Sequence, residues 1–145
     1  MSDLLSPPPL DRLVHALNEH DLEAMVACFA DSYINSTPAH PARGFAGRDQ
    51  VRRNWAHIFE SVPDVRAGLV RTAVDGEVVW SEWEMTGTRF DSTPFLMRGV
   101  VIFQIGADAI TAATFYLEPV EHHSGGADRA VQRVLADPPT PKEHS

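Results

Sequence analysis

The sequence predicts an α+β domain in which helices cover one face of a curved sheet. Apolar residues recur at helical spacing through most of the first sixty positions, and four strand-like segments separated by turn signals follow. A run of helices before a run of strands is typical of this class, with the helices gathered on one face of the sheet. The length of 145 residues suits one domain with a single core.

Three helices are expected before the main strands. The first has an apolar stripe formed by Leu10, Leu13, Val14 and Leu17. Asp21 is a good N-cap for the second helix, whose apolar stripe runs to Phe29. The third helix is expected over residues 48–60, and Pro63 follows its end.

One short strand and four longer ones make up the predicted sheet. The short strand covers residues 33–35, after a turn at residues 30–32 and before a loop at residues 36–47. The longer strands are expected at residues 65–74, 77–89, 95–105 and 109–118. Turn signals such as Asp75-Gly76 separate these four strands, so we expect an antiparallel meander.

The two central strands have one mostly apolar face. Successive side chains of a strand point to opposite sides of the sheet. The odd positions are Val79, Ser81, Trp83 and Met85 on one strand and Met97, Gly99, Val101 and Phe103 on the next. We therefore expect the odd positions to face the helices and the even positions to face away. Such a sheet encloses either a packed core or a pocket for a small apolar molecule.

Composition excludes several classes of function. The net charge is −8 and the twelve Lys and Arg residues are scattered, which argues against nucleic-acid binding. The apolar runs are too short to cross a membrane and the first residues lack a signal-peptide pattern, so we expect a cytoplasmic protein. The single cysteine, Cys28, is expected to be a buried apolar residue.

No cofactor is expected. His122 and His123 are adjacent in the sequence and have no cluster of Cys or acidic residues around them, so they do not predict a metal site. No phosphate-binding loop or dinucleotide motif is present in the sequence.

The chain divides into three parts. Residues 1–9 are a proline-rich lead that we expect to be flexible, and residues 10–120 form the folded domain. Residues 121–145 form a C-terminal tail, in which residues 127–135 are expected to make a short amphipathic helix and residues 138–145 to be disordered.

Five segments together carry a family resemblance. They are ALNEHDLEAMVACFADSYIN (16–35), GFAGRDQVRRNWAHIF (44–59), VVWSEWEMTGTRF (78–90), RGVVIFQI (98–105) and AITAATFYLEP (109–119). In this order they resemble the SnoaL-like proteins of the nuclear transport factor 2-like superfamily. The resemblance implies a cone-shaped, curved antiparallel sheet with three N-terminal helices on its concave face. It also implies an interior pocket for a small hydrophobic molecule and a homodimer packed through the outer sheet face.

The resemblance does not specify a reaction, because this fold carries isomerases, cyclases, hydrolases and proteins without catalysis. Ketosteroid isomerases use an aspartate after the first strand, whereas residues 33–38 here contain no carboxylate. Limonene epoxide hydrolases have a Tyr-x-Asn pair that Tyr33 and Asn35 match. Their acidic and basic partners correspond here to Trp83, Met85 and Phe115. The pocket aspartate of SnoaL-type cyclases is likewise absent from the inward positions that we expect on the last strand.

Three polar residues are therefore the catalytic candidates: Tyr33, Asn35 and His40. A neutral imidazole on the loop over the pocket mouth could act as a base at neutral pH. The structural alternatives are an exposed loop histidine and a Tyr–Asn pair that closes the edge of the core. The candidates for substrate contact are Trp55, Phe59, Trp83, Met85, Met97 and Phe115, which either line a pocket or fill the core.

The even face has a different pattern. Its members on adjacent strands are Glu82, Glu84, Arg98, Tyr116 and Glu118. Such residues suit a cross-strand ion network on an outer or dimer face, with Trp80, Val100 and Ile102 as apolar patches. Acid–base chemistry by the paired carboxylates is the alternative. Two functions stay open at this point: a small-molecule isomerase, cyclase or hydrolase, and a non-catalytic ligand-binding or dimeric interaction protein.

Overall fold

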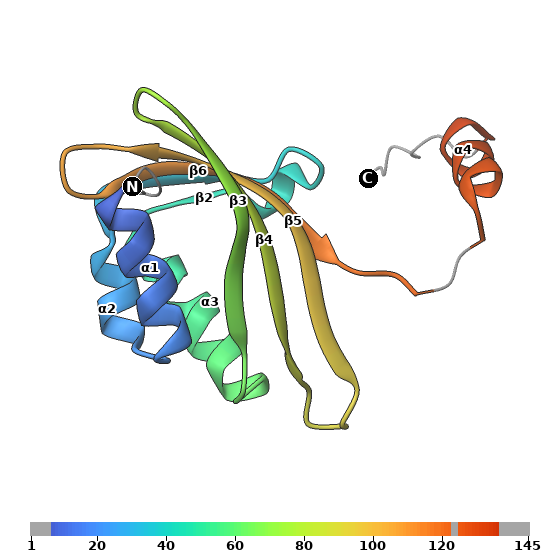
Figure 1. Ribbon diagram of the computed structural model, residues 1–145, viewed down its shortest axis with the longest axis horizontal. Helices are drawn as coiled ribbons and strands as arrows, with labels where there is room; N and C mark the ends of the chain where they lie inside the picture. Colours follow the sequence, from blue (N-terminus) through green and yellow to red (C-terminus); the bar gives the residue numbers. More distant parts are fainter. Residues whose placement is uncertain (1–6, 123–124, 137–145) are drawn as a thin grey trace, which may run out of the picture.

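The computed structural model describes residues 7–122 and 125–136. The elements are α1 (Pro8–Asn18), α2 (Leu22–Ala27), β1 (Phe29–Ser36), a 3-10 turn η1 (Pro41–Arg43), β2 (Phe45–Ala46), α3 (Arg48–Ser61), β3 (Arg66–Asp75), β4 (Val78–Thr88), β5 (Pro94–Ile105), β6 (Ile110–Pro119) and α4 (Ala127–Ala136). The α+β class is confirmed. Helices α1, α2 and α3 lie together inside the bend of a curved sheet (Figure 1).

The strands form one sheet in the order β2-β1-β6-β5-β4-β3. The meander from β3 to β6 is antiparallel, as predicted. The prediction for the first strand was wrong in length, because β1 begins at Phe29 rather than after a turn at residues 30–32. The reason is pairing with a distant strand: β1 runs parallel to β6, and the amide of Ile110 donates to the carbonyl of Cys28 at 2.9 Å.

Each of the three N-terminal helices begins at residues that favour a helix start. Two prolines occupy the first turn of α1, where a missing N–H costs nothing. That helix therefore starts inside the lead that we expected to be flexible. The carboxylate of Asp21 caps α2 by accepting from the amide of Ala24 at 3.1 Å. Gly47 precedes α3 with a φ of 92°, a conformation that favours glycine.

The predicted orientation of the central strands is confirmed. Trp83 on β4 is 3% exposed and packs in the core, whereas its neighbour in the other row, Trp80, is 51% exposed. The indole N–H of Trp83 donates to Ser81 Oγ at 2.8 Å, and that hydroxyl donates to the carbonyl of Val101 at 2.7 Å. The polar atoms of this inward row are therefore satisfied, as burial requires.

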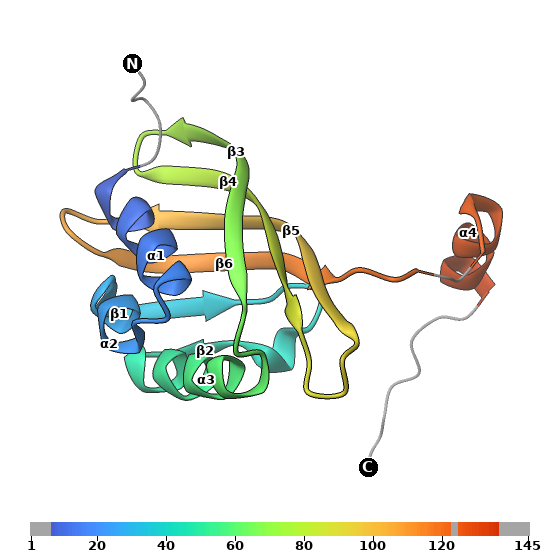
Figure 2. The same ribbon diagram turned by 60° about the horizontal axis from the view of Figure 1, so that its bottom comes forward.

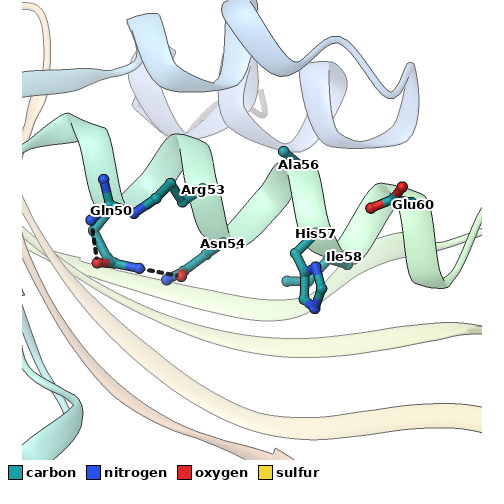
Figure 3. Close-up of a pocket in the computed structure, with 7 residues that line it drawn as sticks. All are labelled: Gln50, Arg53, Asn54, Ala56, His57, Ile58 and Glu60. Atoms are coloured by element: carbon teal, nitrogen blue, oxygen red, sulfur yellow. Dashed lines mark hydrogen bonds between the residues drawn. The ribbon is translucent and has the colours of Figure 1, made fainter.

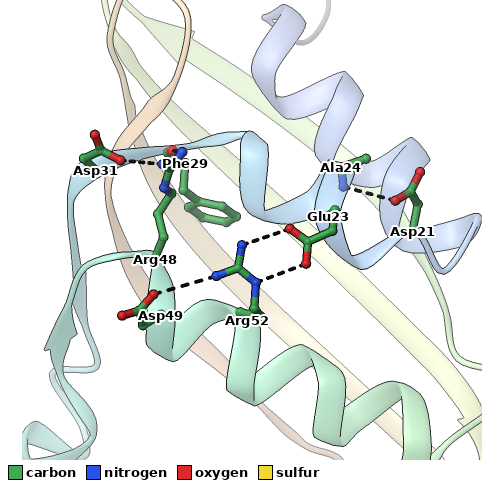
Figure 4. A network of polar contacts seen from close by, with 8 residues as sticks. All are labelled: Asp21, Glu23, Ala24, Phe29, Asp31, Arg48, Asp49 and Arg52. Carbon is green, nitrogen blue, oxygen red and sulfur yellow. Dashed lines mark hydrogen bonds and ion pairs between the residues drawn. The ribbon is translucent and has the colours of Figure 1, made fainter.

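Polar contacts at the edges of the helical layer hold the helices on the sheet and on one another. Asn18, at the end of α1, bonds to both backbone groups of Ala67 on β3, at 2.9 and 2.8 Å. Arg52 on α3 forms a two-pronged contact with Glu23 on α2, at 2.9 and 3.1 Å (Figure 4). Arg48 pairs with Asp31 on β1 at 2.5 Å, so α3 is tied to both α2 and β1.

Helix α4 stands apart from the rest of the molecule in both views (Figures 1 and 2). It covers the segment expected to be helical, and all ten of its residues are exposed. Residues 1–6 and 137–145, which include most of the expected flexible lead and disordered end, lie outside the described residues. Within the described part of the chain, every helix is too short or too polar to cross a lipid bilayer.

Candidate functional site

A cavity of about 40 Å³ lies between the helices and the inward face of the sheet. Its walls come from every layer: Leu13, Leu17, Met25, Phe29, Trp55, Trp83, Met85, Val101, Phe103, Phe115 and Leu117. All of these side chains are apolar apart from the indole N–H groups of Trp55 and Trp83, and that of Trp83 is already bonded to Ser81. The cavity therefore offers dispersion and desolvation but no acid or base.

The volume limits what the cavity holds in this conformation. One water molecule takes about 30 Å³ in the liquid, and a dry cavity of about 150 Å³ is known to accept benzene. The cavity is thus smaller than a benzene-sized ligand needs. Trp55, Phe115 and Leu117 are partly exposed, whereas most of the other lining residues are buried. The wall between α3 and β6 is consequently the least confined part of the enclosure.

A buried polar pair lies on the inward row of β1. The hydroxyl of Tyr33 donates to Asn35 Oδ1 at 2.7 Å, and both side chains are buried. The Tyr33 ring packs edge-on against Phe29, with 4.7 Å between centroids, and Phe29 is part of the cavity wall. Burial raises the pKa of the Tyr33 phenol well above its usual value, because the phenolate would lose its hydration.

Within the described part of the chain, the amide nitrogen of Asn35 makes no side-chain hydrogen bond, since its contact with Tyr33 uses the oxygen. The pair thus leaves one donor group free at the end of the inward row. Neither Tyr33 nor Asn35 lines the 40 Å³ cavity, although Tyr33 touches its wall through Phe29.

His40 lies with the outer face. Its Nε2 is 3.2 Å from Glu118 Oε2, and both side chains are partly exposed. Glu118 is on the even row of β6, opposite the row that lines the cavity. The loop that carries His40 therefore brings the ring beside the even face and not into the cavity wall.

Residues 10–113 match the model of the SnoaL-like domain family. The protein belongs to the SnoaL-like domain family. The resemblance carried by the five sequence segments is confirmed by this match, which spans more than half of the chain. None of the curated proteins matches this SnoaL-like chain.

Solved structures show the same fold at low sequence identity. A protein with a ketosteroid isomerase-like fold from Catenulispora acidiphila DSM 44928, solved in complex with trimethylamine, has a TM-score of 0.67 at 18% identity, over 77% of this chain and 86% of that one. An NTF2-like protein of unknown function from Exiguobacterium sp. 255-15 has a TM-score of 0.63 at 18% identity, over 79% of this chain and 99% of that one.

A putative SnoaL-like polyketide cyclase from Shewanella denitrificans OS-217 has a TM-score of 0.64 at 12% identity, over 76% of this chain and 88% of that one. At these identities the likeness concerns the fold. What this SnoaL-like domain binds has to be argued from its own residues.

The predicted contact residues fall into two groups in this SnoaL-like domain. Trp55, Trp83, Met85 and Phe115 line the cavity. Phe59 instead stacks on the imidazole of His20, with 4.9 Å between ring centroids, and Met97 packs against the edge of the core.

Sequence reasoning did not propose the other seven lining residues as contacts for a substrate. Their apolar spacing had placed Leu13, Leu17 and Met25 in the core, so a pattern that predicts burial could not tell core from cavity wall. Phe29 had been placed at the end of the second helix, and its strand position follows only from the parallel pairing with β6.

The even face carries separate ion pairs rather than the network that the sequence predicts, because, among the described residues, Arg98 contacts Glu84 only, while Glu82 pairs with Arg71 and Glu118 with His40. Arg98 Nη2 contacts Glu84 Oε2 at 2.7 Å, and Arg71 Nε contacts Glu82 Oε1 at 2.6 Å. Alongside lie the exposed side chains of Trp80 and Tyr116.

Two further hollows lie at the surface. One, of about 740 Å³, is lined by seven residues that all belong to α3, from Gln50 to Glu60, so the lining supplies no second wall (Figure 3). The other, of about 450 Å³, is a groove between the end of α3 and the β4–β5 hairpin. No group of three or more His, Cys, Asp or Glu side chains within the described residues is arranged to hold a metal ion.

Proposed function

We propose that this SnoaL-like domain binds a small apolar molecule between its three N-terminal helices and the inward face of the sheet. The observation that supports this is the cavity wall, because eleven apolar side chains from helices and strands converge on one interior space. Burying an apolar ligand against such a wall is favourable by about 25 cal/mol for each Å² removed from water. The proposal requires no metal or organic cofactor.

Binding requires the cavity to widen. The ligand would displace Trp55, Phe115 or Leu117, whose partial exposure leaves room for another rotamer. Enlarging the space at that wall should therefore improve binding. Leu117→Ala removes a lining side chain there, and Leu96→Ala makes the same change on the outward row of β5 as a matched control.

The experiment is a thermal-shift titration of the full chain and both variants with toluene and indole. Each ligand should raise the melting temperature of Leu117→Ala more than that of the parent chain, while Leu96→Ala responds as the parent does. A Leu117→Ala variant that folds but gains no ligand response would refute the interior site. An equal gain in Leu96→Ala would show that the ligands bind elsewhere.

A second candidate is an isomerase, cyclase or hydrolase of a small hydrophobic substrate. It is favoured by the Tyr33–Asn35 pair, in which the Tyr33 ring contacts Phe29 of the cavity wall and its hydroxyl is bonded to Asn35, whose amide is a free donor. In this version Tyr33 and Asn35 orient a water molecule or a substrate carbonyl. His40 would act as a base only after its loop moves it away from Glu118.

Turnover of an enone, an epoxide and a linear polyketone by the full chain tests this candidate. Tyr33→Phe, Asn35→Ala and His40→Ala should each lower any detected rate by about 10²-fold if the residue handles a proton or a water molecule. Ser36→Ala, next to Asn35 on the exposed row of β1, is the control and should leave the rate unchanged. Unchanged rates in Tyr33→Phe and Asn35→Ala would exclude the pair as the site.

We also propose a homodimer through the even face of the sheet. Trp80, Val100, Ile102 and Tyr116 would form its apolar centre and the Glu84–Arg98 pair its polar rim. A two-fold interface uses the same patch on both copies, which suits a central apolar area with charges beside it. A cytoplasmic location is likewise a proposal, in keeping with a single cysteine that is buried and unpaired.

A further inference from the structure

Helix α4 is amphipathic, and among the residues that the structure describes no surface covers its apolar stripe (Figures 1 and 2). Ala127, Ala130, Val131, Val134 and Leu135 recur at helical spacing, and the opposite side carries Arg129, Gln132 and Arg133. Val134 and Leu135 are 74% and 76% exposed. A ten-residue helix is marginal in water by itself, so its stripe needs a surface to become stable.

The groove between α3 and the β4–β5 hairpin is a suitable surface. Its apolar lining is Ile58, Val62, Phe90 and Phe95, and its volume is about 450 Å³. Phe90 is 76% exposed, as exposed as Leu135 on the helix. Amphipathic helices commonly lay their apolar side into grooves of this kind.

The short tether limits how far α4 can lie from this groove. The amide of Val120 donates to the carbonyl of Leu96 at 3.0 Å, so the chain leaves β6 beside the neighbour of Phe95. Only residues 121–126 then separate this point from the first residue of α4, so Val120 and Ala127 are at most about 25 Å apart when the chain is extended. The nearer part of the even face is a poorer surface, because Glu84, Arg98 and Glu118 are charged and already in ion pairs there.

Charge favours the same choice. Asp91 lines the groove, and Glu60 and Asp64 lie next to its lining residues, while Arg89 is the guanidinium on the rim. The Arg89 guanidinium is engaged with the Phe95 ring and with the carbonyl of Pro94. The helix brings Arg129 and Arg133 against one acidic residue, Asp128. A helix with one more positive than negative side chain would thus dock beside Asp91, the carboxylate among the groove's lining residues.

We propose that α4 docks through its apolar stripe into the α3–hairpin groove of its own chain. The arrangement in Figures 1 and 2 is then the undocked state, and docking buries the most exposed apolar side chains of both surfaces together. This inference does not depend on a ligand in the interior cavity.

Hydrogen exchange of the full chain tests the proposal. In the parent chain the amides of residues 130–136 should exchange at least about tenfold more slowly than in Phe90→Asp, which removes the groove's apolar contact. Val74→Asp introduces the same charge at another exposed apolar position, at the far end of β3, and it should leave α4 protected. Fast exchange of α4 in the parent chain would overturn the proposal.

The reciprocal variant is on the helix. Leu135→Asp should speed exchange of the α3 end, residues 58–62, whereas Gln132→Asp on the opposite side of the helix should not. Equal effects of the two variants would overturn the proposal, because only Leu135 is on the stripe.

Dilution and added lipid distinguish docking of α4 within its own chain from docking on a second copy or on a lipid surface. Protection of α4 that persists on stepwise dilution, with a constant mass by light scattering, supports docking within one chain. Protection that disappears on dilution would assign the helix to a groove on a second copy and overturn the proposal. Protection that arises only when vesicles of phosphatidylglycerol are added would assign it to a lipid surface, with the same consequence.

Discussion

Tyr33 is a buried residue that carries a reactive group, the phenol hydroxyl, next to the cavity wall. Its hydroxyl is out of contact with water and bonded to Asn35 Oδ1, and its ring touches the cavity wall through Phe29. The spacing of two between Tyr33 and Asn35 allowed their common face to be predicted from the sequence, because strand side chains alternate. The contact between His40 and Glu118 could not be predicted, since it depends on the path of a loop with no periodic pattern.

Alkaline titration tests the burial of this phenol. The pKa of Tyr33 is raised in the folded chain, so the folded state keeps its proton while the unfolded chain ionises near pH 10. The contribution of Tyr33 to the free energy of unfolding is therefore complete below about pH 10. Above that pH it falls by about 1.4 kcal/mol for each further pH unit, because only the unfolded chain loses the proton.

The chain has two tyrosines, so Tyr116→Phe isolates the Tyr33 signal at 295 nm. We expect no tyrosinate absorbance in that variant until far-UV circular dichroism reports unfolding. Ionisation near pH 10 in a chain that is still folded would show that Tyr33 is accessible to water.

At the scale of elements, how well each strand could be predicted depends on whether its pairing partner is near or far in the sequence. The central strands alternate cleanly because one face is buried and the other is not, and their bounds were predicted to within about two residues. β1 was shortened in the prediction because its first half, from Phe29 to Ser32, contains turn-forming residues. Its strand conformation is imposed by pairing with β6, which follows it by about eighty residues.

Gly99 is the residue on which the β5–β6 pairing depends. Its φ is 154°, and a Cβ there would lie 2.1 Å from the carbonyl oxygen of Tyr116 and 2.7 Å from Leu117 Cα. Because backbone atoms cannot yield as a side chain can, Gly99→Ala should lower the free energy of unfolding by about 3 kcal/mol.

Gly68→Ala on β3 is the matched control, since nothing lies within 4 Å of its Cβ position. Urea denaturation of both variants measures the difference. Equal stabilities for the two variants would mean that β5 and β6 do not approach each other this closely.

For the whole molecule, the sequence predicted the fold class and the inward face, but not the size of the space inside. Apolar periodicity says which side chains are buried, and packing in three dimensions decides whether they touch or leave a cavity. The same limit applies to assembly, because apolar periodicity does not say what covers the exposed apolar residues of the even face.

Light scattering after size-exclusion chromatography tests the proposed assembly. The parent chain should elute as a dimer, and Trp80→Asp should elute as a folded monomer, because a charge at the centre of the apolar patch would be buried without a partner. Val74→Asp, at a similarly exposed position that pairs with the inward Val79, should stay dimeric. A parent chain that is monomeric at high concentration contradicts the dimer.

The interior site is tested most directly by methyl NMR of the full chain with labelled methionine. Among its four methionines, Met25 and Met85 line the cavity, whereas Met97 packs beside it and Met1 is at the chain start. Addition of toluene should shift the methyl signals of Met25 and Met85 in a saturable way and move Met1 little. Saturable shifts confined to Met1 or Met97, or no shifts at saturating toluene, would contradict an interior binding site.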